Sequence, residues 1–508
     1  MAENVVTLGA TGLDLEALIG IARKGARVVL AAAARAPIAR AYEVVCRLQR
    51  EGAAVYGVTT GLGAAVDIST AGQDPIAIQT RLPHARSVGV GRTARRDEVR
   101  AIMAARTATL AQGGSGISPT ALDALIAMLN AGVHPVTPLT GSLGEADLAP
   151  LAHIAMPLVG GGEAEFGGEV LAAGEALKRA RIVAPRLGPK DGLALVSSNA
   201  ASIGLAALAA ADARQALDAL AIATAMSIEA YRANLTPLDV RAQAARPALG
   251  QQAVAARLAA LLADSTLWRP GAARNLQDPL SFRIVSQVHG AAHAALGAAV
   301  AAVELELASR ADSPLVLAED GVAISTGNFD ATHVALSLEA LGQALTRVGA
   351  LAIERCAKLM SPRFSDLPRF LSPVQQGRTG FATVQKTLAA LAAEMQHLAN
   401  PAPIIVMPVA DRVEDYATMA TMIADKTAGI ALRLRLVAAI ELMVAAQAYD
   451  LRGIAEPGVG VAAAHRAVRA VVPPLGEDRS TAADIAALET LIASDRLAAA
   501  VAAALAVG

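Results

Sequence analysis

The chain has 508 residues, and its 44 Lys and Arg residues against 45 Asp and Glu residues give a formal net charge of −1. This balance argues against nucleic acid as the main partner, because phosphate binding requires a basic face. Hydrophobic residues make up 54% of the chain but aromatic residues only 2%, so the apolar content is largely alanine, leucine and valine, which favours helices over strands.

Membrane insertion is worth testing because the mean hydropathy is +0.45. The most apolar stretches, around Leu193–Ala211 and Leu497–Val507, are interrupted by polar residues or are too short to be the apolar run of about 18 residues that spans a bilayer. No basic segment followed by an apolar one opens the chain, so we expect no signal peptide and a cytoplasmic protein. Two cysteines, Cys46 and Cys356, predict neither a disulfide framework nor a metal site.

Residues 1–190 are expected to form a mixed N-terminal domain with short helices and glycine-rich breaks. Ser118 followed by Pro119 before an apolar run predicts a helix that begins there, with serine as the N-cap and proline in the first turn. The glycine-rich stretch Val159–Glu169 predicts a small hairpin, because glycine tolerates the positive φ angles of tight turns.

Residues 191–450 are expected to form a central helical bundle, and residues 451–508 a helical tail. Two apolar stripes with helical spacing of three and four residues support the bundle. These stripes are Leu338, Leu341, Leu345, Val348 and Ala352, and Val384, Leu388, Leu391, Met395 and Leu398. In the tail, Thr481 and Asp484 resemble a capping box for a last helix. We therefore predict a mainly α protein.

Tyr56 is the first candidate for catalysis, because it opens the loop Tyr-Gly-Val-Thr-Thr-Gly-Leu-Gly63 and its glycines allow close backbone approach. A tyrosine in such a loop can act as a general base when neighbouring positive charge favours its ionised form. The alternative is a phenol that only anchors the loop by one hydrogen bond.

Two further segments carry candidate polar groups. Glu145 and Asp147 lie where a loop runs into a helix, a place that suits carboxylates either as caps or as a functional pair. Arg283 presents a fork-shaped donor that can bind a substrate carboxylate or a structural acid. His289 and His293 are one helical turn apart, but no third ligand follows, so we expect no metal.

Together and in this order, these segments resemble the family of aromatic amino acid ammonia-lyases and aminomutases, which includes the histidine, phenylalanine and tyrosine ammonia-lyases. The resemblance runs from about Tyr56 to Met419. Its matching pieces are the Tyr56–Gly63 loop, Gly-Ser-Leu-Gly144 with Asp147-Leu-Ala-Pro-Leu-Ala, Gly192-Leu-Ala-Leu195, Gln277-Asp-Pro with Ser-Phe-Arg283 and Gln-Val-His289, Gly327-Asn-Phe329, and Glu414-Asp415. The resemblance implies a mainly α fold with a long central bundle, and a homotetramer whose sites are shared between subunits.

The sequence departs from the family where the family's electrophile, methylidene-imidazolone, forms from an internal Ala-Ser-Gly. Here Gly144 and Asp147 enclose only Glu145 and Ala146, one residue short and without the serine. We therefore expect no cofactor. Other departures from the family pattern stand at Ala85-Arg86, Ser197, Leu280, Ala308–Pro314, Asp330, and Val413 to Tyr416.

The sequence thus predicts a lyase-like enzyme of this family that acts on a small, amino-acid-like carboxylate by elimination, addition or isomerisation. The resemblance makes Tyr56 the proton-transfer group and Arg283 the carboxylate ligand, and Glu145 is expected to act as a second acid or base or to contact a cationic group. Further substrate-binding residues are expected to be Arg86, Ser197, Asn328, Phe329 and Glu414. The expected partners are the substrate and other copies of the chain, with no nucleic acid and no membrane.

Two alternatives remain open at this point. One is a non-catalytic homologue that serves as a binding or scaffold subunit, which the altered pocket residues favour and the retained Tyr56 and Arg283 oppose. The other is an ammonia-lyase that uses a different device.

Overall fold

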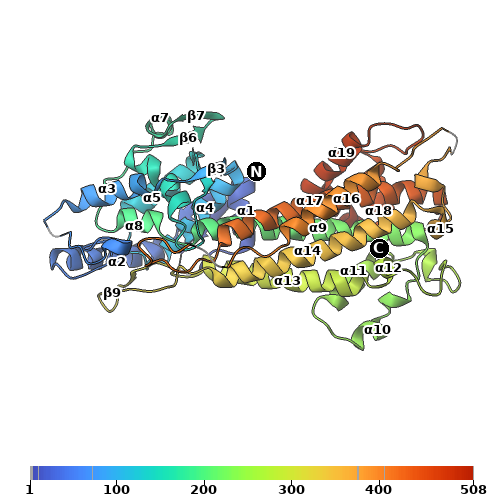
Figure 1. Cartoon of the computed structure of the whole chain (residues 1–508), viewed down its shortest axis with the longest axis horizontal. Coiled ribbons are helices and arrows are strands. Elements are labelled where there is room, and N and C mark those ends of the chain that lie inside the picture. The colour runs from blue at the N-terminus through green and yellow to red at the C-terminus, as the bar shows by residue number, and fades with distance from the viewer. Residues whose placement is uncertain (1–3, 10, 71, 375–376, 405–406, 507–508) are drawn as a thin grey trace. The chain divides into compact units, whose positions relative to one another are not determined.

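The computed structural model describes residues 4–9, 11–70, 72–374, 377–404 and 407–506, and it is mainly helical, as predicted (Figure 1). The chain folds into two compact units. Unit 1 comprises Met1–Ala209, Ala299–Leu338 and Pro401–Asp425, and unit 2 comprises Ala210–Ala298, Glu339–Asn400 and Lys426–Gly508. The division into residues 1–190, 191–450 and 451–508 that the sequence pattern suggested stays a prediction.

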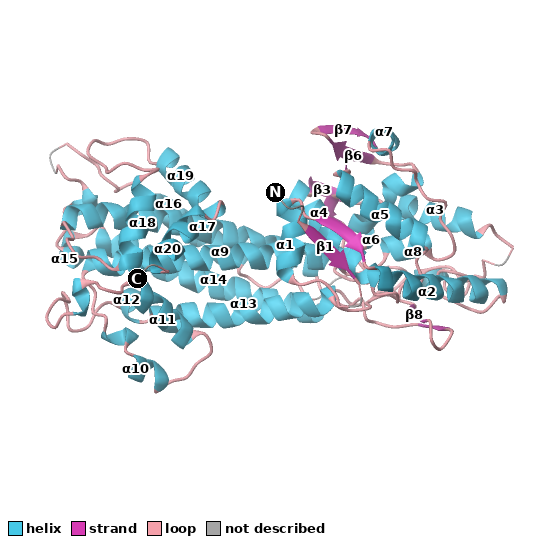
Figure 2. Ribbon diagram, turned by 180° about the vertical axis from the view of Figure 1, so that it is seen from behind, coloured by secondary structure: helices cyan, strands magenta, loops and turns pink. Residues whose placement is uncertain are grey.

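Unit 1 contains the short helices α1–α8 and the strands that the described residues form. The helices are α1 (Leu15–Lys24), α2 (Ala32–Arg50), α3 (Pro75–Arg86), α4 (Arg96–Ala111), α5 (Pro119–Ala131), α6 (Leu148–Ala155), α7 (Ala173–Arg179) and α8 (Asp191–Val196). The strands form small sheets, shown in magenta in Figure 2. They are the parallel pair β1 (Val5–Leu8) and β2 (Arg27–Leu30), the antiparallel pair β3 (Val90–Thr93) and β5 (Pro138–Thr140), the antiparallel sheet β4 (His134–Pro135), β6 (Glu163–Phe166) and β7 (Glu169–Ala172), and the antiparallel pair β8 (Leu315–Leu317) and β9 (Val322–Ile324).

Long helices dominate the second half. They are α9 (Ala200–Tyr231), α13 (Val285–Leu307), α14 (Thr332–Leu359), α16 (Val384–Leu398) and α17 (Ala420–Arg452). Shorter helices are α10 (Val240–Ala244), α11 (Gln251–Leu261), α12 (Leu280–Arg283), α15 (Pro362–Ser365), α18 (Val459–Arg469), α19 (Ala482–Ala493) and α20 (Arg496–Leu505). The 3₁₀ helices are η1 (Gly63–Ala65), η2 (Met156–Val159), η3 (Thr236–Leu238), η4 (Thr266–Trp268) and η5 (Arg369–Leu371).

Local sequence signals were confirmed in two places and failed in one. Helix α5 begins as predicted, because the Ser118 hydroxyl accepts a hydrogen bond from the Ala121 amide and Pro119 occupies the first turn. The predicted hairpin is β6–β7, which turns at Gly167 and Gly168, both with positive φ. The capping box at Thr481 is wrong: this residue is already helical, so its hydroxyl does not reach the helix amides.

The centre of unit 1 is built around α4, which is buried along almost its whole length. Its Arg106 is fully buried and pairs with the buried Asp312, with 2.8 Å between Nη2 and Oδ1. The same guanidinium donates to the carbonyl of Ala194 at the end of α8. One buried charge pair therefore ties α4 to two segments that follow it far along the chain.

The core of unit 2 confirms the predicted apolar stripes. Leu338, at the end of unit 1, and Leu341, Leu345 and Val348 on α14 are buried, as are Val384 and Leu388 on α16. Three helices are joined by polar contacts inside this core: Arg355 of α14 forms a bidentate pair with Glu441 of α17, at 2.6 and 2.9 Å, and Ser227 of α9 donates to the same carboxylate at 2.7 Å.

Two segments of the described structure are long and apolar enough to cross a membrane by length and composition, Asp191–Tyr231 and Val285–Leu307, although the sequence alone indicated none. In the first segment 94% of the apolar window is buried inside the protein. The core helix of a folded protein meets the same criteria of length and composition, so these two segments are weak evidence for a membrane span.

Candidate functional site

Tyr56 lies at the start of a loop that folds back on itself in unit 1. Its phenol oxygen accepts a hydrogen bond from the Gly63 amide at 2.9 Å, which closes the loop around the ring. Gly57 and Gly63 both have positive φ, which explains glycine at these positions. The tyrosine is half-buried. The loop therefore holds the phenol in place and leaves its own O–H proton available.

Arg86 lies close enough to both Glu414 and Tyr56 for its charge to interact with theirs. Arg86 ends α3 and is half-buried, and this burial lowers the pKa of its guanidinium against the opposing influence of Tyr56 and Glu414. Glu414 is exposed and pairs through its backbone with Val409. Three of the predicted site residues thus form a first group in unit 1.

The loop between β5 and α6 is held by hydrogen bonds to its backbone. The carbonyl oxygens of Leu143 and Gly144 accept from the amide of Met419 and the hydroxyl of Thr418, at 2.8 Å each, and that of Ala146 accepts from the Ser198 amide at 3.1 Å. Gly144, Ala146 and Asp147 all have positive φ, a conformation that costs energy at the two non-glycine positions.

Asp147 is a buried anchor rather than a helix cap. Its side chain makes no capping hydrogen bond to α6. Instead, its carboxylate accepts from Ser142 Oγ at 2.6 Å, from Thr421 Oγ1 at 3.1 Å, and from the amide and hydroxyl of Ser202 at 2.7 and 2.9 Å. Complete burial raises the pKa of Asp147, while these donors oppose the shift. This network fixes the strained loop and with it the neighbouring Glu145.

Glu145 faces Asp330, and the two residues form an antiparallel backbone bridge. Burial raises the pKa of Glu145 to about 8, with further contributions from the charge of Asp330 and a hydrogen bond with it, and from the charge of Asp147. Glu145 therefore carries a proton at neutral pH and can exchange it in the range where enzymes work. The sequence showed Asp330 only as a difference from the family pattern, whereas the structure shows that it contacts Glu145.

The remaining expected ligands in unit 1 lie next to Asp330 or to Ser198 in the chain. Asn328 and Phe329 directly precede Asp330, and Asn328 is exposed whereas Phe329 is half-buried. Ser197 directly follows the end of α8 and precedes Ser198, which contacts the Ala146 carbonyl. Two neighbours were missed from the sequence: Asn199 and Glu306, whose side chains share a 2.6 Å hydrogen bond. Neither belongs to a motif, so no sequence signal could have found them.

Arg283 belongs to unit 2 and is not among the residues that unit 1 brings together. It is the last residue of α12 and is half-buried. Its guanidinium has no hydrogen bond or ion pair within the described ranges, so its five donors are available to an external group.

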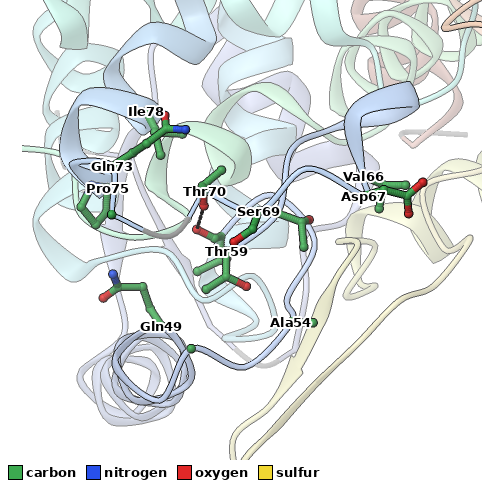
Figure 3. Close-up of a pocket in the computed structure, with 14 residues that line it drawn as sticks. Gln49, Ala54, Thr59, Val66, Asp67, Ser69, Thr70, Gln73, Pro75 and Ile78 are labelled. Atoms are coloured by element: carbon green, nitrogen blue, oxygen red, sulfur yellow. Dashed lines mark hydrogen bonds between the residues drawn. The ribbon is translucent and has the colours of Figure 1, made fainter.

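A cavity of about 520 Å³ is lined in part by Thr59 of the Tyr56 loop (Figure 3). It is lined mainly by small and uncharged side chains, among them Gln49, Thr59, Ser69, Thr70 and Gln73. None of the predicted site residues lines it, so it is separate from the candidate site. Among the residues that the structure describes, no three His, Cys, Asp or Glu side chains gather as metal ligands would.

The comparisons with known proteins agree with this fold and these loops. Residues 13–470 match the family model for aromatic amino acid lyases. The chain is 40% identical over 500 residues to a histidine ammonia-lyase of Symbiobacterium thermophilum, with 98% of each chain covered. It therefore belongs to the aromatic amino acid lyase family, as the sequence motifs indicated.

Two solved structures show the same fold over nearly the whole chain. The ergothioneine-degrading enzyme ergothionase from Treponema denticola, solved with desmethyl-ergothioneine sulfonic acid, has a TM-score of 0.92 and 29% identity, covering 97% of this chain and 99% of that one. Histidine ammonia-lyase from Trypanosoma cruzi has a TM-score of 0.90 and 30% identity, covering 98% of this chain and 95% of that one.

These comparisons contradict the expectation that the protein has no cofactor. Relatives of this identity over nearly the full length are histidine ammonia-lyases, and membership in their family implies the methylidene-imidazolone group. The residues at Gly144–Asp147 do not match the Ala-Ser-Gly precursor of that group, and the carbonyl oxygens of Gly144 and Ala146 are engaged in hydrogen bonds.

Proposed function

We propose that this protein is an amine-eliminating lyase that acts on an amino-acid-like substrate with a carboxylate group. In this reaction a C–H bond next to the C–N bond breaks, its electron pair forms a C=C bond, and the amine leaves with the C–N electron pair. The proton goes to the phenolate oxygen of Tyr56, which becomes a neutral phenol, and the product is an unsaturated carboxylic acid. Family membership and the activity for which the histidine ammonia-lyase relatives are named support this reaction class.

The observation that carries the proposal is the setting of Tyr56. A phenol that abstracts a proton needs a fixed position and a positive charge nearby, because both favour the ionised form in the reaction. The Gly63 amide supplies the first and the Arg86 guanidinium the second. Both features belong to unit 1 and do not depend on any group outside the chain.

The substrate carboxylate is assigned to Arg283. A guanidinium that has no partner in the described structure is costly to leave half-buried, and a carboxylate satisfies it through two parallel hydrogen bonds. Because the family resemblance implies sites shared between subunits, we propose that Arg283 serves the Tyr56 site of another copy of the chain. Glu145 is assigned to the nitrogen end of the substrate.

Substrates can be tested by following the ultraviolet absorbance of the conjugated acid and the release of ammonia or amine. The panel should contain histidine, phenylalanine and tyrosine, because the family acts on aromatic amino acids, together with ergothioneine, the substrate named for one structural relative. Elimination from a member of this panel is the expected result. If none of these compounds is converted or bound, a non-catalytic binding subunit becomes the better interpretation.

Replacing Tyr56 by phenylalanine tests the assignment of the base. Tyr56→Phe should leave substrate affinity nearly unchanged and lower turnover by roughly 10²–10⁴-fold, the usual contribution of a positioned acid or base. Tyr449→Phe is the matched control, because Tyr449 stacks on His465 in unit 2 and should retain full activity. Full activity of Tyr56→Phe would show that the proposed mechanism is wrong.

A further inference from the structure

Three carboxylates and one amide lie together in unit 1, on segments that are far apart in the sequence. We call Glu145, Asp330, Glu306 and Asn199 the carboxylate cluster. Glu145 and Asp330 face each other across a backbone bridge, and the charge of Asp330 acts on both Glu145 and Glu306. Asn199 joins the cluster because its Nδ2 donates to Glu306 Oε2 at 2.6 Å.

Two acceptor atoms of the carboxylate cluster have no hydrogen-bond partner in the part of the chain that the structure describes. These atoms are Asn199 Oδ1 and Glu145 Oε1, and both are buried. The side chain of Asn199 is 0% exposed, although its other polar atom is satisfied by Glu306. Buried acceptors are rarely left without a donor, because the loss of water is then uncompensated. The cluster therefore lacks a group that carries N–H or O–H donors.

The charge of the carboxylate cluster defines what that group is. The charge of His333 acts on Glu306, whereas the leading contributions to the raised pKa of Glu145 are burial and the neighbouring carboxylates of Asp330 and Asp147. A cation with several N–H donors satisfies both the charge and the two orphaned oxygen atoms. A primary ammonium group has three such donors, whereas a quaternary ammonium group has none and is bound by aromatic faces instead.

We propose that the carboxylate cluster binds the positively charged nitrogen of the substrate and selects a primary ammonium group over a quaternary one. This inference rests on the proposed function and specifies its substrate class. It assigns to Glu145 the role of cation ligand, and it makes Asn199 and Glu306 specificity-determining residues. The leaving amine then departs as a neutral molecule and needs no proton from the cluster.

Binding of the cation should be linked to loss of a proton from Glu145. Burial and the neighbouring Asp330 and Asp147 raise the pKa of Glu145 to about 8, so this side chain is mostly neutral at pH 7. The other carboxyl of the cluster with a raised pKa is Glu306, which faces Asp330 and His333. A cationic ligand favours the ionised carboxylates, so its affinity should increase between pH 7 and pH 8.5.

The test compares three probes that differ only at the nitrogen: L-histidine, its N,N,N-trimethyl betaine and its deamino analogue, 3-(imidazolyl)propionate. The same series is made for phenylalanine and tyrosine, and dissociation constants are measured by calorimetry with the full-length protein at pH 7 and pH 8.5. In at least one series, the primary amine should bind about 10–100-fold more tightly than the other two probes, the usual worth of hydrogen bonds between charged groups.

Variants separate this inference from the general proposal. Glu306→Gln and Glu145→Gln should remove most of the preference for the primary amine and leave the affinity of the deamino analogue nearly unchanged. Glu319→Gln is the control, because Glu319 is an exposed glutamate of the same unit that pairs with Arg40 at the surface. Circular dichroism and the retained affinity for the deamino analogue show that each variant is folded.

Three results would overturn the inference: equal or tighter binding of a betaine, an unchanged preference in both cluster variants, or no binding by any probe. The first two leave the proposed elimination intact, because conversion of a substrate by wild type and its loss in Tyr56→Phe are measured separately. If wild type converts no substrate but keeps its preference for the primary ammonium probe, the result counts against the proposed function alone.

Discussion

At the scale of the residue, Glu145 combines a strained backbone neighbourhood with an unusual ionisation. Gly144, Ala146 and Asp147 around it all have positive φ, and the four hydrogen bonds to the Asp147 carboxylate hold this geometry. Strain of this kind persists where the surroundings over-determine the backbone, and it is frequent at functional sites. The environment thus places a protonated carboxyl group where an ordinary surface glutamate would be ionised.

The raised pKa of Glu145 predicts how stability depends on pH. Between about pH 4.5 and pH 8 the folded protein holds a proton on Glu145 that the unfolded chain has released, so this residue lowers the free energy of unfolding as pH rises through that window. Glu145→Gln cannot ionise and should lose less stability over the same range. We expect a difference of roughly 1–2 kcal/mol, reduced because the group is only half-buried.

Urea denaturation of wild type and Glu145→Gln at pH 5, 6.5 and 8.5 measures this difference. The exposed Glu319→Gln variant should follow the wild-type curve. Parallel pH profiles for wild type and Glu145→Gln would mean that the Glu145 carboxyl is not held neutral in the folded protein.

At the scale of the element, α14 carries two ion pairs of very different worth. Arg355 is fully buried and forms its bidentate pair with Glu441 of α17, while it also donates to the Ser281 carbonyl at 3.1 Å. Lys358, less than one turn further on, pairs with Glu354, whose side chain is 62% exposed. The two pairs therefore provide a matched test of burial on a single helix.

Removing one partner of the buried pair should be far more damaging than removing one partner of the exposed pair. Arg355→Met leaves Glu441 as an uncompensated buried charge and should lower the free energy of unfolding by about 3–5 kcal/mol. Glu354→Gln should change it by less than about 1 kcal/mol, because Glu354 is exposed and a pair at the surface gains little over water. Guanidinium denaturation measures both values, and similar losses would contradict the assignment of Arg355 as a core residue.

At the scale of the whole molecule, one chain leaves apolar helix surface uncovered. In the apolar window of α13 only 39% of the residues are buried, and Leu305 on this helix is 56% exposed. Large uncovered apolar surfaces usually mark interfaces. The predicted homotetramer stays a prediction, and light scattering at micromolar concentration should find about four times the mass of the 51.4 kDa chain. A monomer would refute it.

Shared sites make a further prediction that a single chain cannot fulfil. Arg283→Lys should weaken substrate binding although it keeps the charge, because lysine offers a point charge and not a fork. Mixed oligomers of Tyr56→Phe and Arg283→Lys chains, assembled by refolding or co-expression, should regain part of the activity that each variant lacks. No recovery in mixed oligomers would place both residues in a site formed by one chain.

The sequence by itself determined the helical class, the family and most of the local structure. The stripes on α14 and α16, the Ser118 cap and the β6–β7 turn follow from spacing and from the backbone preferences of serine, proline and glycine, which act over a few residues. The candidates Tyr56, Arg283 and Glu414 could also be proposed from the sequence, because the short segments around them resemble those of the family.

Only the tertiary structure decided which of these residues meet and in what state of ionisation. Asp147 is an anchor and not a cap because Ser202 and Thr421 reach it from distant segments. Glu145 is neutral near pH 7 because folding buries it against Asp330, and Asn199 and Glu306 enter the cluster through a contact between residues 107 positions apart. Burial and long-range contacts set these properties, and neither is written in the local pattern of the sequence.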